Sequence, residues 1–237
     1  MTMKRVLLAS SAVAIILAMS PVAEASGSLY FSAFGGANWL RSDANPFLSS
    51  SSSTSQSLRA SADTGFVIGA AVGLHLDNWL NGLRAEWEAS YRRNKVHGIW
   101  TESGTSSGPF EGRESTFAMM ANVWYDINIG SKLVPYVGGG VGAATAQNSG
   151  VIIDVSRIAF VDATFDNRYF GMAWQLGAGV HYEFMHGANI GLGYRYFRGP
   201  DFHYAGVSGG EGSIDDWIGT IKNENHEVMV DLTIDID

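Results

Sequence analysis

The ionisable residues of this chain recur at every second position of short runs. In the run Leu83–Arg92 they include Arg84, Glu86, Glu88 and Arg92. A period of two places alternate side chains on one face of a β-strand. Charges gathered on one face can pair with each other, or they can lead a proton or an ion along that face. Similar runs elsewhere add four charged positions to this set: Glu183, Arg195, Glu227 and Asp231.

The role of these charges depends on whether their face is enclosed. An enclosed ion must be paired and hydrogen-bonded, because desolvation otherwise costs several kcal/mol per ion. We therefore interpret the set as a barrel-interior polar network, a plug of ion pairs, with a gated proton or ion path as the alternative. The plug predicts that Arg84 and Arg195 each lie within salt-bridge reach of an inward carboxylate.

The opposite face of these runs is apolar. The clearest case is Tyr169–Phe184, in which one set of alternate residues is apolar and aromatic at both ends, while the other is small or polar. Soluble strands usually have about 5–6 residues, whereas a long strand with aromatic ends is typical of membrane-spanning barrels. Hydrocarbon offers no partner for backbone N–H and C=O groups, so a sheet crosses a bilayer only when it closes on itself.

Seven further runs show the same alternation, and a total of eight is even, as a closed antiparallel barrel of this kind needs. The predicted fold class is all-β: an eight-stranded antiparallel up-and-down transmembrane β-barrel with short periplasmic turns and long extracellular loops. The predicted strands are 29–40, 66–76, 83–92, 117–127, 133–144, 169–184, 189–197 and 227–237.

The connecting segments alternate between short and long. Three are short, and four are long and polar, which predicts turns on one rim and structureless loops on the other. Within the third long segment, Val151–Val161 is unusually apolar. It either extends the flanking strands as a hairpin or forms a contact surface for a partner or ligand, and both interpretations stay open here. The short connectors are 77–81, 130–132 and 185–187, and the long ones are 41–62, 93–114, 145–167 and 198–225.

The beginning of the chain has the pattern of an export signal. A short basic segment precedes the apolar run Val6–Met19 and the small-residue site Ala23–Ala25. This pattern predicts a signal peptide over residues 1–25, and the alternating strands then predict an outer-membrane barrel domain over 26–237. The apolar run is shorter than the ~20 residues that a membrane-spanning helix needs.

The composition excludes several classes of function. The formal net charge is −8, which argues against nucleic acid as a partner, since its phosphates would be repelled. There is no cysteine, so disulfides and thiolate metal sites are excluded. The six histidines show no spacing typical of metal ligands. We therefore predict no catalytic residues, no cofactor and no metal.

Two glycine-rich segments match known motifs but lack the required context. Gly138–Ala143 has the G-x-G-x-x-A form of a dinucleotide loop, which means something only before a helix, and no helical periodicity follows it. Gly206–Gly210 has the G-x-S-x-G form of a nucleophile elbow, which needs a strained strand-to-helix turn. We instead expect inward glycines to leave room for Tyr136 and Trp124 in a narrow lumen.

Several segments resemble the small outer-membrane β-barrel proteins of Gram-negative bacteria. They are Asn122–Asp126, Pro135–Gly142, Gly193–Tyr196 and His226–Val230, and the nearest likeness is to the porin-like surface antigens of alphaproteobacteria, related in architecture to the membrane domain of outer-membrane protein A. The resemblance implies a place in the cell outer membrane, among lipid and lipopolysaccharide, after insertion by the barrel-assembly machinery. Such proteins usually end in an aromatic residue, whereas this chain ends Ile234–Asp237.

The leading hypothesis for function is a non-enzymatic integral outer-membrane surface protein. Its extracellular loops would serve envelope structure, adhesion or contact with an extracellular ligand or host surface. One alternative is a lipid-modifying barrel enzyme, which would need His186 or His203 together with Ser208. The other alternative is a narrow gated channel.

Overall fold

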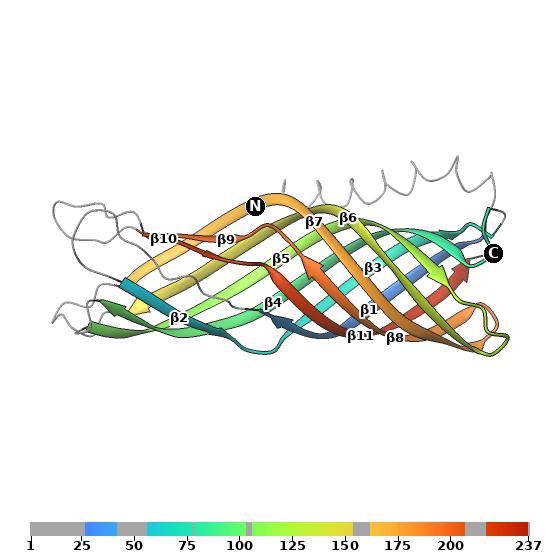
Figure 1. Cartoon of the computed structure of the whole chain (residues 1–237), viewed down its shortest axis with the longest axis horizontal. Coiled ribbons are helices and arrows are strands. Elements are labelled where there is room, and N and C mark those ends of the chain that lie inside the picture. Colours follow the sequence, from blue (N-terminus) through green and yellow to red (C-terminus); the bar gives the residue numbers. More distant parts are fainter. Residues whose placement is uncertain are drawn as a thin grey trace, which may run out of the picture.

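Eight of the strands in the computed structural model close into one antiparallel barrel (Figure 1). The structure describes residues 27–41, 56–77, 79–102, 106–153, 162–206 and 217–236. Around the barrel the order is β4-β3-β1-β11-β8-β7-β6-β5, and β5 pairs again with β4. The strands are β1 (Leu29–Leu40), β2 (Gln56–Ala62), β3 (Gly65–His75), β4 (Leu83–Glu102), β5 (Ser106–Asp126), β6 (Leu133–Ile153), β7 (Asp162–Met185), β8 (Ala188–Arg198), β9 (Phe202–Gly206), β10 (Trp217–Ile221) and β11 (Glu224–Ile236).

The predicted eight-stranded closed barrel is therefore confirmed. β1 begins and ends at the predicted residues, and β8 and β11 differ from their predicted runs by a few residues at their ends. Every barrel pairing is antiparallel, including β1 with β11, which joins the two ends of the described chain. None of the described residues lies in a helix that is long and apolar enough to cross a membrane.

Four strands run much further than the alternation predicted. β4 and β5 stay paired from Leu83↔Tyr125 to Glu102↔Ser106, and β6 and β7 stay paired as far as Ile153↔Asp162. The segments 93–114 and 145–167 were thus wrongly expected to be structureless loops. Their alternation is weak because beyond the membrane both faces of a strand can be polar.

The other two long segments also contain strands. β2 pairs with the distal part of β4, and β9 pairs with β10 in a separate two-stranded sheet. These strands lie toward one end of the barrel, and the C-terminus lies at the other (Figure 1). For the apolar segment 151–161, the hairpin interpretation is confirmed over Val151–Ile153, which belongs to β6. The rest of this segment, the predicted signal peptide and Ser208 lie outside the described residues.

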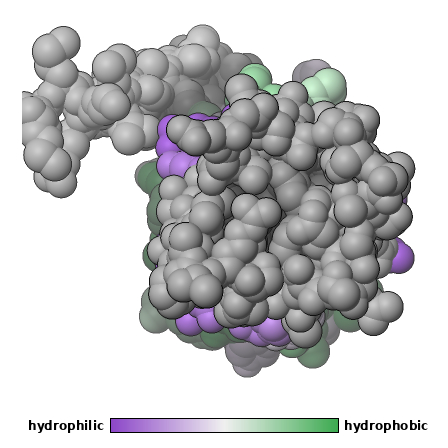
Figure 2. Space-filling view, turned by 90° about the vertical axis from the view of Figure 1, so that its left-hand side faces the viewer, coloured by the Kyte–Doolittle hydropathy of each residue, from purple (hydrophilic) through white to green (hydrophobic). Residues whose placement is uncertain are grey.

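The two faces of the sheet differ in exposure as the alternation predicted. Outward residues such as Ile68 and Val230 are exposed at 53% and 51%, whereas inward neighbours such as Val67 and Met229 are buried. Leu74 departs from this rule, since it alternates with the outward set but is buried. Seen from the end that carries β2, β9 and β10, hydrophilic residues appear at the rim and hydrophobic ones behind them (Figure 2). An exposed apolar band of this extent is suited to lipid rather than to water.

Three short connections depend on glycine in the left-handed region. Gly82, Gly130 and Gly187 have φ values of 86°, 72° and 73°. They lie in the β3–β4, β5–β6 and β7–β8 connections, at the barrel end where the described chain begins and stops. Residues with a side chain adopt this conformation at a cost, so the turn positions favour glycine. The long hairpins are all at the opposite end.

A lipid-facing band predicts that charge is tolerated at its edges but not in its middle. We expect Val230→Arg, near the middle of the outward face of β11, to lower the free energy of unfolding by about 2–4 kcal/mol. Ile236→Arg, on the same face at the end of the strand, should cost no more than about 1 kcal/mol. Denaturant unfolding of the protein in lipid vesicles measures both changes. Equal costs at the two positions would contradict the assignment of this face to lipid.

Candidate functional site: the barrel lumen

The inward charges of β4 form the axis of a polar network inside the barrel. Arg84, Glu86, Glu88 and Arg92 are all buried. They occupy alternate positions of one strand, so their side chains enter the lumen at successive levels. Their partners come from strands on several sides of the barrel.

One ion pair crosses the full width of the lumen. Nη1 of Arg195 on β8 donates to Oε1 of Glu88 on β4 at 2.8 Å. In the closed order of eight strands, β4 and β8 are four places apart in either direction, so they lie on opposite walls. Both side chains are buried. The pair therefore bridges the barrel through its centre.

A second ion pair closes the lumen nearer to the long hairpins. Nε of Arg92 donates to Oε1 of Glu227 on β11, and both residues are buried. The guanidinium carbon of Arg92 lies 3.6 Å from the ring centre of Phe197 on β8. Arg92 also donates to Ser90 at 2.9 Å. Arg92 thus reaches from β4 toward two strands on the far side and fills the space between them.

Neutral side chains complete the hydrogen bonding of the two carboxylates on β4. Glu88 accepts from Gln175 on β7 and from Asn122 on β5, each at 3.0 Å. Glu86 accepts from Asn122, from the indole N–H of Trp124 and from the hydroxyl of Tyr30. These hydrogen bonds offset part of the desolvation cost of burying the two carboxylates.

Arg84 forms the third pair, close to the rim with the short turns. Its Nε lies 2.7 Å from Oδ2 of Asp126 on the adjacent strand β5. Arg84 also donates to the hydroxyl of Tyr30 at 3.3 Å. Arg84 and Arg195 therefore each lie within salt-bridge reach of an inward carboxylate, as the plug hypothesis requires.

Two of the eight predicted residues stand apart from this core. The side chain of Glu183 is 46% exposed and lies 3.7 Å from His186 in the β7–β8 turn. It points out of the lumen's centre because the register shifts between Glu183 and Met185, where β7 ends. Asp231 faces the lumen, but its partner is His181, at 3.2 Å.

The charge pattern alone missed a chain of buried amides near the long hairpins. Asn38 donates to Asn94 at 2.6 Å and to Asn225 at 3.0 Å. Asn225 donates to Asn223, which donates to Thr116. The chain links β4, β1, β11 and β5, so it ties several walls together at one level. The sequence does carry a signal for it. These residues occupy the alternate positions whose side chains face the lumen, and this alternation continues beyond the apolar runs.

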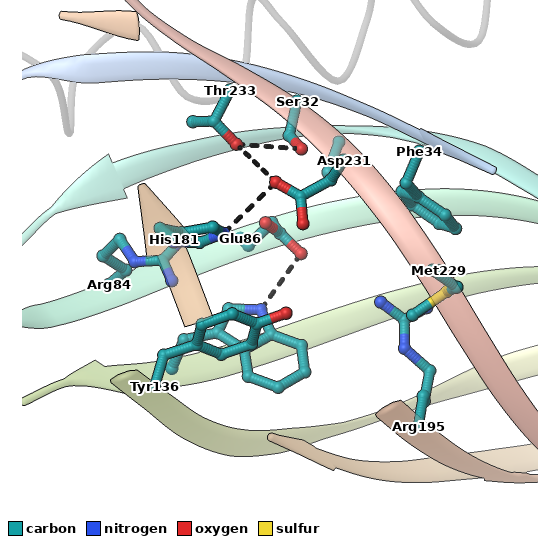
Figure 3. A pocket seen from close by; sticks show the side chains of 12 residues that line it. Ser32, Phe34, Arg84, Glu86, Tyr136, His181, Arg195, Met229, Asp231 and Thr233 are labelled. Carbon is teal, nitrogen blue, oxygen red and sulfur yellow. Dashed lines mark hydrogen bonds and ion pairs between the residues drawn. The ribbon is translucent and has the colours of Figure 1, made fainter. Parts of the chain in front are cut away.

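A small cavity lies in the lumen on the side of the short turns. Its volume is about 40 Å³, which is room for water but not for a solute. His181 contacts Asp231 on its wall, and Thr233 and Ser32 lie beside Asp231 (Figure 3). The ring of Tyr136 stacks on His181 at 4.5 Å.

The hydroxyls in this cavity are not arranged for nucleophilic catalysis. A nucleophile must contact the imidazole that takes its proton. Here the Thr233 hydroxyl donates to Asp231 at 3.3 Å and lies 3.2 Å from the Ser32 hydroxyl. The carboxylate, not the imidazole, is the contact of the hydroxyls. In the part of the chain that the structure describes, no three or more His, Asp or Glu side chains are grouped to hold a metal ion.

Comparison with known proteins agrees with this geometry. A family model described as the outer membrane protein beta-barrel domain matches residues 9–232. Uncharacterized proteins of Brucella abortus, Brucella suis and Brucella melitensis are 28% identical over 148 residues, covering 55% of this chain and 51% of theirs. The chain thus spans about half the length of these relatives.

Two solved structures that are similar to this chain come from Pseudomonas and Neisseria. OprG from Pseudomonas aeruginosa has a TM-score of 0.56 at 12% identity, covering 89% of this chain and 97% of that one. Neisserial surface protein A has a TM-score of 0.43 at 16% identity, covering 88% and 97%. The family model and OprG confirm the resemblance and the fold that the sequence predicted.

The paired state of the lumen can be tested by breaking one ion pair in two ways. Arg195→Met leaves Glu88 buried without its cation and should lower the free energy of unfolding by about 3–5 kcal/mol. The double variant Arg195→Met/Glu88→Gln removes both charges, so it should be clearly more stable than the single variant. Denaturant unfolding in vesicles gives both values.

Glu183→Gln provides the matched carboxylate-to-amide control. Glu183 lies at the exposed rim, so its loss should change stability by no more than about 0.5 kcal/mol. If Arg195→Met were as mild as this control, the cross-lumen pair would not be a structural element.

Proposed function

Since the chain belongs to the outer membrane protein beta-barrel domain family, we propose that it is a non-enzymatic, non-conducting surface protein of the cell outer membrane. Its barrel is an anchor with a filled interior. The paired ends of the long hairpins face the outside, and the short glycine turns face the periplasm. Envelope structure, adhesion and contact with an extracellular ligand are the roles that suit such a protein.

The observation that carries this proposal is the filled lumen. The pairs Arg195–Glu88 and Arg92–Glu227 cross it at two levels, and the amide chain from Asn38 spans it at a third. An eight-stranded barrel has an interior just wide enough for side chains. Ions that already hold each other across such a space leave no continuous path for hydrated ions.

The extended hairpins give this anchor its outer surface. β4 and β5 are paired over their full distal length, and β2 adds a third strand beside β4. β6 and β7 form a second long hairpin. Sheets of this length position a surface firmly above the membrane, and this favours a contact role over a role in transport.

The candidate histidines of the enzyme alternative lie at opposite ends of the barrel. His186 lies fully exposed in the β7–β8 turn, whereas His203 belongs to β9 at the other end of the barrel. The two histidines are alternatives for one site, and Ser208, which either of them would need, lies outside the described residues. The hydroxyl, carboxylate and imidazole in the cavity are ordered wrongly for acyl transfer.

A filled lumen predicts that the protein does not conduct ions. The unmodified protein should show no discrete conductance steps in a planar bilayer at about 100 mV. This potential acts on each elementary charge with roughly 2.3 kcal/mol. Arg92→Ala/Phe197→Ala removes the guanidinium and the ring that fill one level, but the Arg195–Glu88 pair still crosses the lumen at another, so this variant should also show no steps. Lys132→Ala, in the exposed β5–β6 turn, is the control and should stay silent. Regular steps from the unmodified protein would establish the channel instead.

The enzyme alternative has its own test. Lipopolysaccharide incubated with the folded protein should keep its acyl chains unchanged, as judged by mass spectrometry. A transferred or hydrolysed acyl chain that depends on folded protein would overturn the non-enzymatic proposal.

A further inference from the structure

The outward face of the barrel changes from apolar to basic at one level. Tyr91 on β4 and Phe117 on β5 are a cross-strand pair at the upper edge of the apolar band. Further toward the long hairpins, this face carries Arg93, which pairs with Ser115 on β5, and Lys95, which pairs with Arg113. These three cations form what we call the basic ledge. The chain carries a net charge of −8, so this gathering of cations is not a reflection of its composition.

Two of these cations are placed directly against each other. Lys95 and Arg113 are partners in the β4–β5 register, and both are exposed on the same face. Like charges directly opposite each other in an antiparallel pair are destabilising. A pair that lowers the stability of the hairpin is expected to be compensated by an anion that lies between the two cations.

The described part of the chain does not supply that anion. The ledge residues form no ion pair with a described carboxylate. The backbone N–H of Asp63 donates to the carbonyl oxygen of Lys95, but the Asp63 carboxylate lies 3.4 Å from the ring of His97. Glu111 is exposed and opposite His97, one diagonal step from Lys95. Among the described residues, no carboxylate therefore lies between these two cations.

The level of the ledge indicates the kind of anion. Below it, the outward residues Trp87, Met119 and Phe117 are exposed and apolar, so they face acyl chains. Aromatic residues in such barrels mark the boundary with the headgroup layer. Cations immediately beyond that boundary lie where phosphate groups of lipids are found. A ligand that contacts both surfaces has acyl chains and a phosphorylated head.

We propose that the basic ledge of Arg93, Lys95 and Arg113 binds the phosphate groups of a phosphorylated glycolipid of the outer leaflet, a lipid A headgroup. The acyl chains of that lipid lie against Phe117 and Met119. Arg168, outward on β7 and bonded to Gln147 at 3.3 Å, borders the ledge on the side of β6. The site is distinct from the lumen, so a failure of this lipid-binding proposal would leave the proposed non-conducting role unaffected.

The test compares lipid binding by the protein and by a ledge variant. Lys95→Ala/Arg113→Ala should reduce the affinity for bisphosphorylated lipid A in detergent micelles at least tenfold, because two charge-assisted contacts are lost. Lys132→Ala, which removes one exposed cation at the opposite rim, should bind as the unmodified protein does. Each variant is first shown to be folded by its resistance to unfolding in cold SDS. Titration followed by native mass spectrometry gives the affinities.

Two further arms decide between sources of the anion. Lipid A stripped of phosphate should bind the unmodified protein and the ledge variant equally weakly. Inorganic phosphate should not displace lipid A at matched concentration. Equal lipid A affinity for the ledge variant and the unmodified protein would overturn the proposal, and so would displacement by free phosphate, which would indicate a soluble-anion site.

Stability gives an independent readout. Without lipid A, Arg113→Ala should unfold at the same or a slightly higher denaturant concentration than the unmodified protein, because a like-charge contact is relieved. Adding lipid A should raise the midpoint of the unmodified protein but not that of the double variant. A midpoint that falls in the lipid-free Arg113→Ala variant would show that Arg113 has a partner within the protein, which contradicts the proposal.

Discussion

The inability of hydrocarbon to hydrogen-bond is the constraint from which the structure follows. Backbone groups in the bilayer must pair with each other, and the return of β5 to β4 achieves this by closing the sheet. The same closure encloses every inward side chain. An enclosed arginine needs a carboxylate, and in a tube the carboxylate can stand on the opposite wall, as Glu88 does for Arg195. Closure of the backbone and pairing of the charges are therefore two results of one requirement.

Glycine makes this crowded interior possible. A Cβ at Gly179 or Gly193 would lie within 2.5 Å of the hydroxyl of Tyr136, and one at Gly177 would be 3.2 Å from the ring of Trp124. This arrangement agrees with the interpretation of Gly138–Ala143 as a glycine-rich segment that leaves room for large side chains, rather than as a nucleotide-binding loop. The large rings occupy the volume that the glycines leave, and they bring a hydroxyl and an indole N–H into the lumen without opening a pore.

Parity along the sequence predicts which face a residue occupies, but not its depth or its partner. It placed Arg84, Glu88 and Arg195 inside correctly, because an apolar neighbour on each side marks the lipid face. It placed Glu183 in the lumen network, although this residue lies where β7 ends at the rim. The partnership of Arg195 with Glu88 depends on the stagger of strands around the barrel, and no local pattern encodes that stagger. The charge pattern does not predict the amide chain from Asn38 to Asn223, because any enclosed polar group needs a hydrogen-bond partner, whether or not it is charged.

The central claim is that one face of this sheet contacts acyl chains and the other contacts only protein. Val67 and Ile68 are neighbours in β3 with opposite orientations, so they test it without any substitution. In methyl-labelled protein in lipid nanodiscs, magnetisation transfer from lipid acyl protons should reach the Ile68 methyl groups strongly and leave those of Val67 unaffected. Transfer to Val67 that equals or exceeds transfer to Ile68 would contradict the account.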